Sequence, residues 1–88
     1  MQTTMHLLQR ALAVQNQARW ADALDLSDAT LSQAKKRGRL SPTIAGAMAA
    51  ELGEDPAAWI SVAALEAEPD TATKRTLLKR LSSKIQKL

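Results

Sequence analysis

Residues 17–42 read QARWADALDLSDATLSQAKKRGRLSP, and this stretch decides the fold. It predicts two short helices, over residues 17–24 and 28–37, joined by a tight turn at Asp25-Leu26-Ser27. Ser27 is a typical helix N-cap, and aspartate at position 25 tolerates left-handed backbone better than most residues do. This spacing is typical of two helices that meet at a steep angle across a short turn.

Further cap and stop signals flank this pair of helices. Ser41-Pro42 and Asp55-Pro56 each place a capping side chain ahead of a proline at the first helical position. Gly38 and Gly53 stand where a glycine can end a helix in left-handed conformation. No useful length of sequence alternates apolar and polar residues as a strand does. The sequence therefore predicts an all-α domain of five to six helices, at residues 4–14, 17–24, 28–37, 42–52, 56–67 and 71–86.

Apolar side chains at helical spacing predict the core of this domain. The chain has 88 residues, of which 45% are hydrophobic, and this suits one small globular unit. Trp20 and Trp59 are expected to anchor the core, because proteins that stack single-stranded bases use several exposed aromatic residues. The expected apolar positions of the first helix are Met5, Leu8 and Leu12, with Leu7, Ala11 and Val14 beside them. Those of the fourth and fifth helices are Ile44, Met48, Leu52, Trp59, Ile60, Val62, Ala63 and Leu65.

Composition excludes several classes of function. The chain has no cysteine, so it has neither a disulfide nor a thiolate metal site, and its one histidine, His6, cannot form a histidine cluster. No catalytic constellation or glycine-rich phosphate loop is present, so we expect no enzyme activity, cofactor or small-molecule substrate. No apolar run reaches the roughly 20 residues that cross a bilayer. We expect a cytoplasmic protein with no membrane partner and no signal peptide.

Charge is distributed in blocks along the chain. The formal net charge is only +3, but four cations, Lys35, Lys36, Arg37 and Arg39, lie within five residues. Residues 51–70 carry six acidic and no Lys or Arg side chains, whereas residues 71–88 carry six basic and no acidic ones. Such blocks predict an uneven surface field and an anionic partner for one face. The acidic segment could also pair with the basic one.

The predicted helix 28–37 has two unlike faces. Leu31 and Ala34 are expected to point inward, while the outward side chains are short or polar. A DNA major groove about 12 Å wide accepts such a helix, and its base edges can be read by short polar groups. Gln33 could pair with adenine, and an acid at position 28 could accept from cytosine. The expected base contacts are Asp28, Ala29, Ser32 and Gln33.

Cations follow this helix at the point where it would leave the groove. Basic groups there can contact the phosphates that fix the register of a protein on DNA. The alternative interpretation is a solvated helix end, since cations near a helix C-terminus also favour the helix dipole. The expected phosphate contacts are Gln17, Thr30, Lys35, Lys36, Arg37 and Arg39.

The stretch resembles the helix-turn-helix of the lambda-repressor and Cro-like family, on Ala21, Leu24, Leu26, Ser27 and Leu31. Gly38-Arg39-Leu40-Ser41-Pro42 looks like the family's usual exit into its fourth helix, and residues 51–56, ELGEDP, look like its next link. The resemblance covers about residues 5–65 and implies a phage or prophage repressor that binds double-stranded DNA as a homodimer. The chain departs from the family at Asp25, where glycine is usual, at Ala34, where tryptophan is frequent, and at Asp28, where many relatives have glutamine.

The last predicted helix has an apolar seam among basic residues. The seam consists of Leu78, Leu81, Ile85 and Leu88, and it is too short for a stable coiled coil by itself. We therefore divide the chain into a helix-turn-helix unit, residues 1–67, and a basic C-terminal helix, residues 68–88. The seam either forms a homodimer interface or packs on its own domain, and the basic residues around it could touch DNA.

A second class of function is open to the same fold. The chain could be a protein-interaction module, such as a phage-borne inhibitor or antitoxin that uses these helices to bind another protein. Loss of duplex affinity with rising salt would favour DNA binding. A tight complex with a protein, and no duplex binding at physiological salt, would favour the interaction module.

Overall fold

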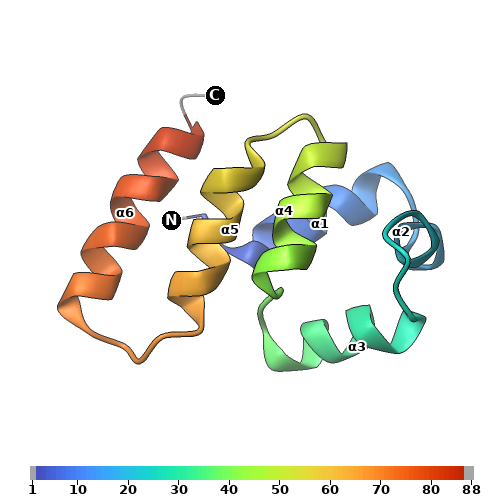
Figure 1. Ribbon diagram of the computed structural model, residues 1–88, viewed down its shortest axis with the longest axis horizontal. Helices are drawn as coiled ribbons and strands as arrows, with labels where there is room; N and C mark the ends of the chain where they lie inside the picture. Colours follow the sequence, from blue (N-terminus) through green and yellow to red (C-terminus); the bar gives the residue numbers. More distant parts are fainter. Residues whose placement is uncertain (1, 87–88) are drawn as a thin grey trace.

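The computed structural model describes residues 2–86 and contains six helices, with no strand among those residues (Figure 1). They are α1 (Thr4–Val14), α2 (Gln17–Ala23), α3 (Asp28–Arg37), α4 (Pro42–Glu51), α5 (Pro56–Glu66) and α6 (Ala72–Gln86). The predicted all-α class is confirmed. Each helix lies within a residue of its expected bounds, because the signals that start and end it are local.

Local caps bound the helices, and Ser27, Ser41 and Gly38 are among those that the sequence indicated. The side chains of Asn16, Ser27 and Ser41 accept from backbone N–H groups of the first turns of α2, α3 and α4. Gly38 ends α3 with φ of 85°. Asp25 has φ of 56°, the one non-glycine residue with positive φ in the described chain. Its backbone N–H donates to Asp22 O, so the turn after α2 is closed by hydrogen bonds as well as by packing.

Both tryptophans are buried, as expected. Trp20 and Trp59 expose 1% and 0% of their surface, and they lie in one core with side chains of all six helices. The indole Nε1 of Trp20 donates to Ala11 O at 2.7 Å, which satisfies the polar edge of a fully buried ring. Two of the expected core positions are wrong. Val14 is 70% exposed, because α1 ends there and the chain turns away from the core, and Ile60 of α5 is 43% exposed.

Thr4 joins three segments inside the core. Its side chain is fully buried, its hydroxyl donates to Glu66 Oε1, and the same hydroxyl accepts from Leu40 N–H at 2.9 Å. The backbone N–H of Thr4 donates to the other carboxylate oxygen of Glu66 at 2.9 Å. The start of α1, the α3–α4 loop and the end of α5 are therefore held at one point.

The apolar seam of α6 packs on its own chain. Leu78 and Ile85 are 6% and 8% exposed within the core, and Leu81 is partly buried against it; Leu88 lies outside the described residues. Gln2 N–H also donates to Ser82 Oγ at 2.9 Å, which ties the start of the chain to α6. The structure thus shows the internal-packing alternative. Residues 68–86 complete the core, and the expected dimer contacts Leu78 and Ile85 have almost no surface left for a partner.

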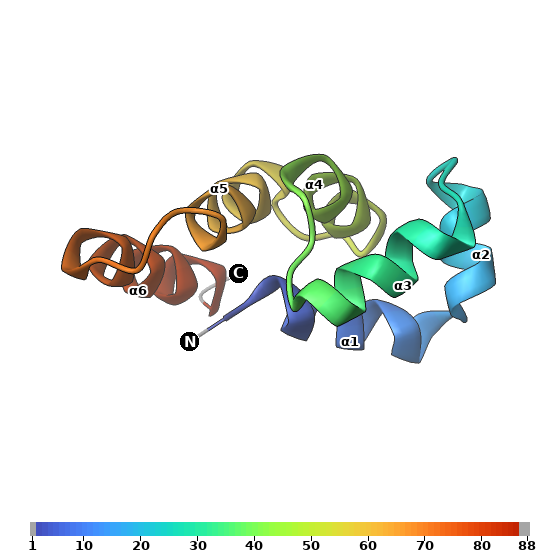
Figure 2. The same ribbon diagram turned by 90° about the horizontal axis from the view of Figure 1, so that it is seen from below.

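The helices of the described chain are too short or too polar to cross a membrane. Figure 2 shows how they are arranged when the molecule is seen from below. Helices α4 and α5 lie side by side along one edge of that view, α3 lies apart from α6, and the N-terminal segment runs between them. This arrangement leaves α3 at the periphery, where one of its sides faces solvent.

Candidate nucleic-acid interface

Helices α2 and α3 form the steeply crossed pair that residues 17–42 predicted. The Leu26 N–H donates to Ala21 O at 2.7 Å and closes the turn between them. Leu31 and Ala34 of α3 are both 0% exposed, so this side of the helix packs in the core. Helix α3 runs along the lower edge of the molecule in Figure 1, with its opposite side free of other helices.

The four expected base contacts lie together on that open side. Asp28, Ala29, Ser32 and Gln33 are all exposed, at positions that share one face of a helix. Ala29 and Ser32 are short, so a partner could approach the backbone of α3 closely. The geometry of this face is therefore compatible with insertion into a major groove.

Gln17 connects α2 to this face. Its amide nitrogen donates to Ser32 Oγ at 3.0 Å and lies 3.3 Å from both Asp28 O and Asp28 Oδ1. The sequence marked Gln17 only as a phosphate contact, and the bond across 15 residues follows from the crossing of the two helices. Gln17 therefore orients two of the expected base-contacting side chains.

Thr30, another expected phosphate contact, lies at the start of α3. Its hydroxyl is 2.9 Å from Ser27 Oγ, and its backbone N–H donates to the same Ser27 oxygen. Thr30 is half-buried, so its hydroxyl is held beside the N-cap instead of extending into solvent. It can present a hydrogen-bonding group at the N-terminal end of α3, next to the positive end of the helix dipole.

The expected cation cluster surrounds the other end of α3. Lys35, Lys36 and Arg37 are exposed and Arg39 is half-buried. The salt bridges among residues 2–86 pair Arg10 with Glu54 and Arg75 with Asp70, so none neutralises this cluster. Uncompensated cations at the end of an exposed helix produce a local positive field.

Lys74 of α6 joins this cluster in space. Together with Arg37, Arg39 and Glu66 it lines a surface hollow of about 330 Å³ between the ends of α1, α3 and α5. Its ammonium group donates to Glu68 O at 2.8 Å and lies 3.4 Å from Glu66 O, which caps the end of α5. Sequence reasoning missed Lys74 because 35 positions separate it from Arg39. In the sequence, Lys74 is distinguished only as one of the six basic residues in the segment 71–88.

Most acidic side chains of residues 51–70 form no salt bridge with the described basic side chains that follow them in the sequence. Among the described residues, one salt bridge joins the two groups, from Arg75 NH1 to Asp70 Oδ1 at 2.8 Å, and both side chains are mostly exposed. Glu66 instead binds Thr4, and Glu54 binds Arg10. Within the described part of α6, Arg75 is paired with Asp70 and Lys74 is bonded to backbone carbonyl groups, whereas Lys79, Arg80 and Lys84 are exposed and take part in no salt bridge.

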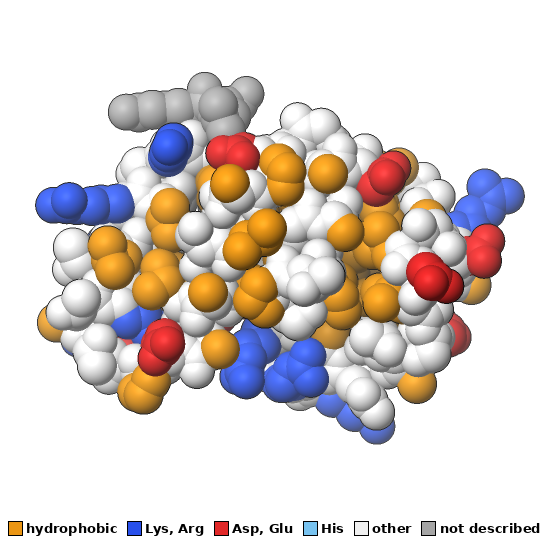
Figure 3. All heavy atoms as spheres, in the orientation of Figure 1, with side chains coloured by type: hydrophobic (Ala, Val, Ile, Leu, Met, Phe, Trp, Pro, Cys, Tyr) orange, Lys and Arg blue, Asp and Glu red, His pale blue; other side chains and the backbone are white. Residues whose placement is uncertain are grey.

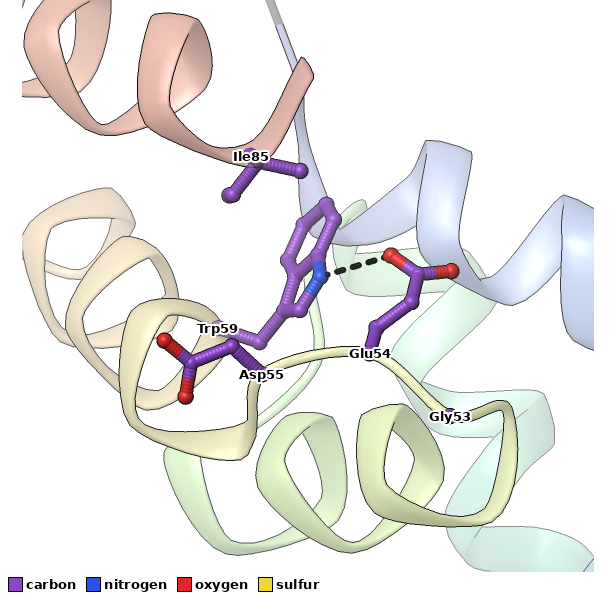
Figure 4. A pocket seen from close by; sticks show the side chains of 5 residues that line it. All are labelled: Gly53, Glu54, Asp55, Trp59 and Ile85. Carbon is purple, nitrogen blue, oxygen red and sulfur yellow. Dashed lines mark hydrogen bonds between the residues drawn. The ribbon is translucent and has the colours of Figure 1, made fainter. Parts of the chain in front are cut away.

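A second hollow lies on another part of the molecule, and its polar side chains have structural roles. It measures about 460 Å³ and is lined by Gly53, Glu54, Asp55, Trp59 and Ile85 (Figure 4). Glu54 Oε1 accepts from Trp59 Nε1 at 3.0 Å and from Arg10 at 2.8 Å, and the Arg10 guanidinium lies 5.5 Å from the centre of the indole ring. Asp55 accepts from Ala57 N–H as the N-cap of α5. Both carboxylates thus have partners within the fold.

Two other sources of information about a functional site are metal-binding groups and similar proteins. The described residues contain no group of three or more His, Asp or Glu side chains that could hold a metal ion. Comparison with protein-family models, curated protein sequences and solved structures finds no match to this chain.

Proposed function

We propose that the chain is a sequence-specific regulator that binds double-stranded DNA, with α3 in the major groove. The observation that supports this most directly is the combination on one helix of a short, polar exposed side and an unneutralised cation cluster at its end. The first can reach base edges, and the second can hold the phosphates beside the groove. The lambda-repressor and Cro-like resemblance agrees with this proposal.

Each part of the surface has a role in the proposal. Gln33 reads a base, and Ser32 and Asp28, oriented by Gln17, contact neighbouring base pairs. Arg37 and Arg39 hold phosphate at the C-terminal end of α3, and Lys74 extends this positive surface onto α6. The protein acts as a homodimer on a two-fold symmetric site and represses transcription by occupying a promoter.

A selection from a random duplex pool, followed by titrations at several salt concentrations, tests the proposal. We expect one enriched sequence. We also expect log K for it to fall with log salt at a slope of about −3.6 per protomer, since phosphate contacts of the four cations Lys35, Lys36, Arg37 and Arg39 would contribute about 0.9 each. Weak binding to all duplexes, with no enriched sequence, would refute sequence-specific reading. A complete absence of duplex binding at physiological salt would refute DNA binding and favour the protein-interaction module.

A further inference from the structure

Arg39 is half-buried and has no anionic partner among the residues that the structure describes. Within residues 2–86, the arginines whose side chains form hydrogen bonds or salt bridges are Arg10 and Arg75. A charged group that is partly withdrawn from water costs free energy unless an acceptor or an opposite charge compensates it. The guanidinium of Arg39 is therefore suited to an anion from outside the fold.

Arg37 and Arg39 border two surface hollows at once. We name them the polar hollow and the apolar hollow. The polar hollow measures about 330 Å³, and its other polar side chains are those of Gln2, Thr3, Glu66 and Lys74. The apolar hollow measures about 340 Å³, and its other lining residues are Leu40, Ser41, Pro42, Ala63 and Ala67. Figure 3 shows Lys and Arg side chains at the lower edge of the molecule, beside hydrophobic ones.

The polar hollow has an excess of positive charge. Three cations, Arg37, Arg39 and Lys74, line it together with one carboxylate, that of Glu66. Both oxygens of Glu66 already accept from Thr4. Lys74 donates to two backbone carbonyl groups, so its ammonium has a third donor to spare. Guanidinium groups bind phosphate with two parallel hydrogen bonds, and this combination of donors therefore favours a phosphate group.

The apolar hollow offers a different kind of contact. Leu40 and Ala63 are each 1% exposed and belong to the core, and Pro42 is half-buried. The hydroxyl of Ser41 accepts from Ile44 N–H as the N-cap of α4, so it already has a partner. The remaining polar groups are the two arginine side chains, whose planar guanidinium groups stack on flat rings. A planar ring would gain both burial and stacking there, whereas an alkyl chain would gain burial alone.

We infer that the two hollows form one binding site for a small phosphorylated molecule with a planar ring, as in a nucleotide. The phosphate groups lie in the polar hollow against Arg37, Arg39 and Lys74, and the ring lies in the apolar hollow. Each volume is near the lower end of the range of about 300–1,000 Å³ for small-molecule sites. Duplex DNA can bring a phosphate to the same arginines, but its bases are stacked inside the duplex and do not reach the apolar hollow.

A nucleotide in this site would regulate the protein by competition. Arg37 and Arg39 are also the phosphate contacts of the proposed DNA complex, so one pair of side chains cannot serve both ligands at once. Binding of the nucleotide should therefore release the duplex. This consequence rests on the proposed function, whereas the site itself does not.

Isothermal titration calorimetry of the full chain without DNA tests the site, with ADP as the probe. The titrations are made at physiological salt, where diffuse attraction between charges is screened. We expect saturable binding of ADP that is at least about 10-fold tighter than that of inorganic pyrophosphate or adenosine. Arg39→Gln should weaken ADP at least about 10-fold. Arg80→Gln is the matched control, because it removes an exposed cation of α6 outside both hollows, and it should bind as the wild type does.

A second pair of variants tests the apolar hollow without changing a charge. Ala67 is exposed at the end of α5 and lines this hollow, so Ala67→Leu should fill part of it. We expect Ala67→Leu to weaken ADP about 10-fold and to leave pyrophosphate within about 2-fold of the wild type. Ala64→Leu, at an exposed position of the same helix outside both hollows, should change neither ligand.

The outcomes separate this inference from the proposed function. Absence of ADP binding up to about 1 mM would overturn the site, as would ADP that binds no more tightly than pyrophosphate. Equal affinities of Arg39→Gln and Arg80→Gln would do the same, since they would indicate attraction by overall charge. ADP should also displace a labelled preferred duplex, and bound ADP that leaves the duplex in place would refute the competition. If ADP binds through Arg39 but no duplex binds, the site stands and the proposed function fails.

Discussion

The amide nitrogen of Gln17 lies 3.0 Å from the Oγ of Ser32, so the first residue of α2 is hydrogen-bonded to the middle of the exposed side of α3. The same nitrogen is 3.3 Å from Asp28 Oδ1. Two side chains that would meet base edges are therefore oriented by a residue on another helix. Orientation before binding matters because each mobile side chain that is immobilised in an interface costs about 0.5–1.5 kcal/mol.

Gln17→Ala should lower affinity for the preferred duplex by about 2- to 10-fold, equivalent to roughly 0.5–1.5 kcal/mol for the lost orienting hydrogen bonds. Thermal stability should change little, because these hydrogen bonds lie at the surface. Gln9→Ala, an exposed glutamine on α1, is the control and should bind as the wild type does. Equal affinity of Gln17→Ala and Gln9→Ala would show that the contact between α2 and α3 does not contribute to binding.

Gln33→Ala and Arg39→Ala should differ in kind. Removing Gln33 should cost about 1–3 kcal/mol on the preferred duplex and relax the choice at one base pair. Removing Arg39 should weaken preferred and scrambled duplexes about equally and reduce the salt slope by about one. Titrations of both duplexes at several salt concentrations measure this. A Gln33→Ala variant that loses the same affinity on both duplexes would contradict the docking of α3 in the groove.

Thr4→Val should destabilise the fold with little change of shape. Valine matches the size of threonine but leaves the buried Leu40 N–H without its acceptor and removes the hydroxyl donor to Glu66. An unsatisfied buried polar group costs about 1–3 kcal/mol, so the melting temperature should fall by about 4–8 °C per kcal/mol. Thr76→Val, on the exposed side of α6, should melt as the wild type does. Equal melting temperatures would show that water replaces the lost partner.

Leu78→Ala and Leu77→Ala compare two neighbouring leucines of α6. Leu78 is 6% exposed and Leu77 is 43% exposed. Leu78→Ala should lower the free energy of unfolding by about 2–5 kcal/mol, while Leu77→Ala should change it by less than about 0.5 kcal/mol. Denaturant unfolding at two protein concentrations is the measurement. A loss for Leu78→Ala that vanished at high dilution would reveal an intermolecular seam instead of the internal one.

Substitutions at Asp25 test the backbone conformation of the turn between α2 and α3. Its φ of 56° suits glycine or aspartate and is strained for a β-branched side chain. Asp25→Val should therefore lower the free energy of unfolding by about 1–2 kcal/mol, whereas Asp25→Gly should stay within about 0.5 kcal/mol of the wild type. Urea unfolding of the three proteins decides this. Similar stability of the valine and glycine variants would mean that the turn adopts another conformation.

The sequence by itself determined the helices and their ends. Ser27, Ser41-Pro42, Gly38 and Asp25 act through backbone groups a few residues away, so their effects are readable without knowing the fold. The exposed side of α3 was also predictable, because burial of Leu31 and Ala34 fixes which residues point outward. The candidate base contacts follow from helical periodicity alone.

Only the tertiary structure decided what depends on contacts between distant segments. Gln17 meets Ser32 because α2 and α3 cross, and Lys74 joins Arg39 because α6 returns along α5. An apolar stripe such as that of Leu78 and Ile85 is expected both for a helix in a dimer interface and for a helix packed on its own domain. Its periodicity therefore could not distinguish the two, and the burial of both side chains in the core does. Likewise α4 and α5 are apolar on every side, and only their packing shows that Ile60 is left at the surface.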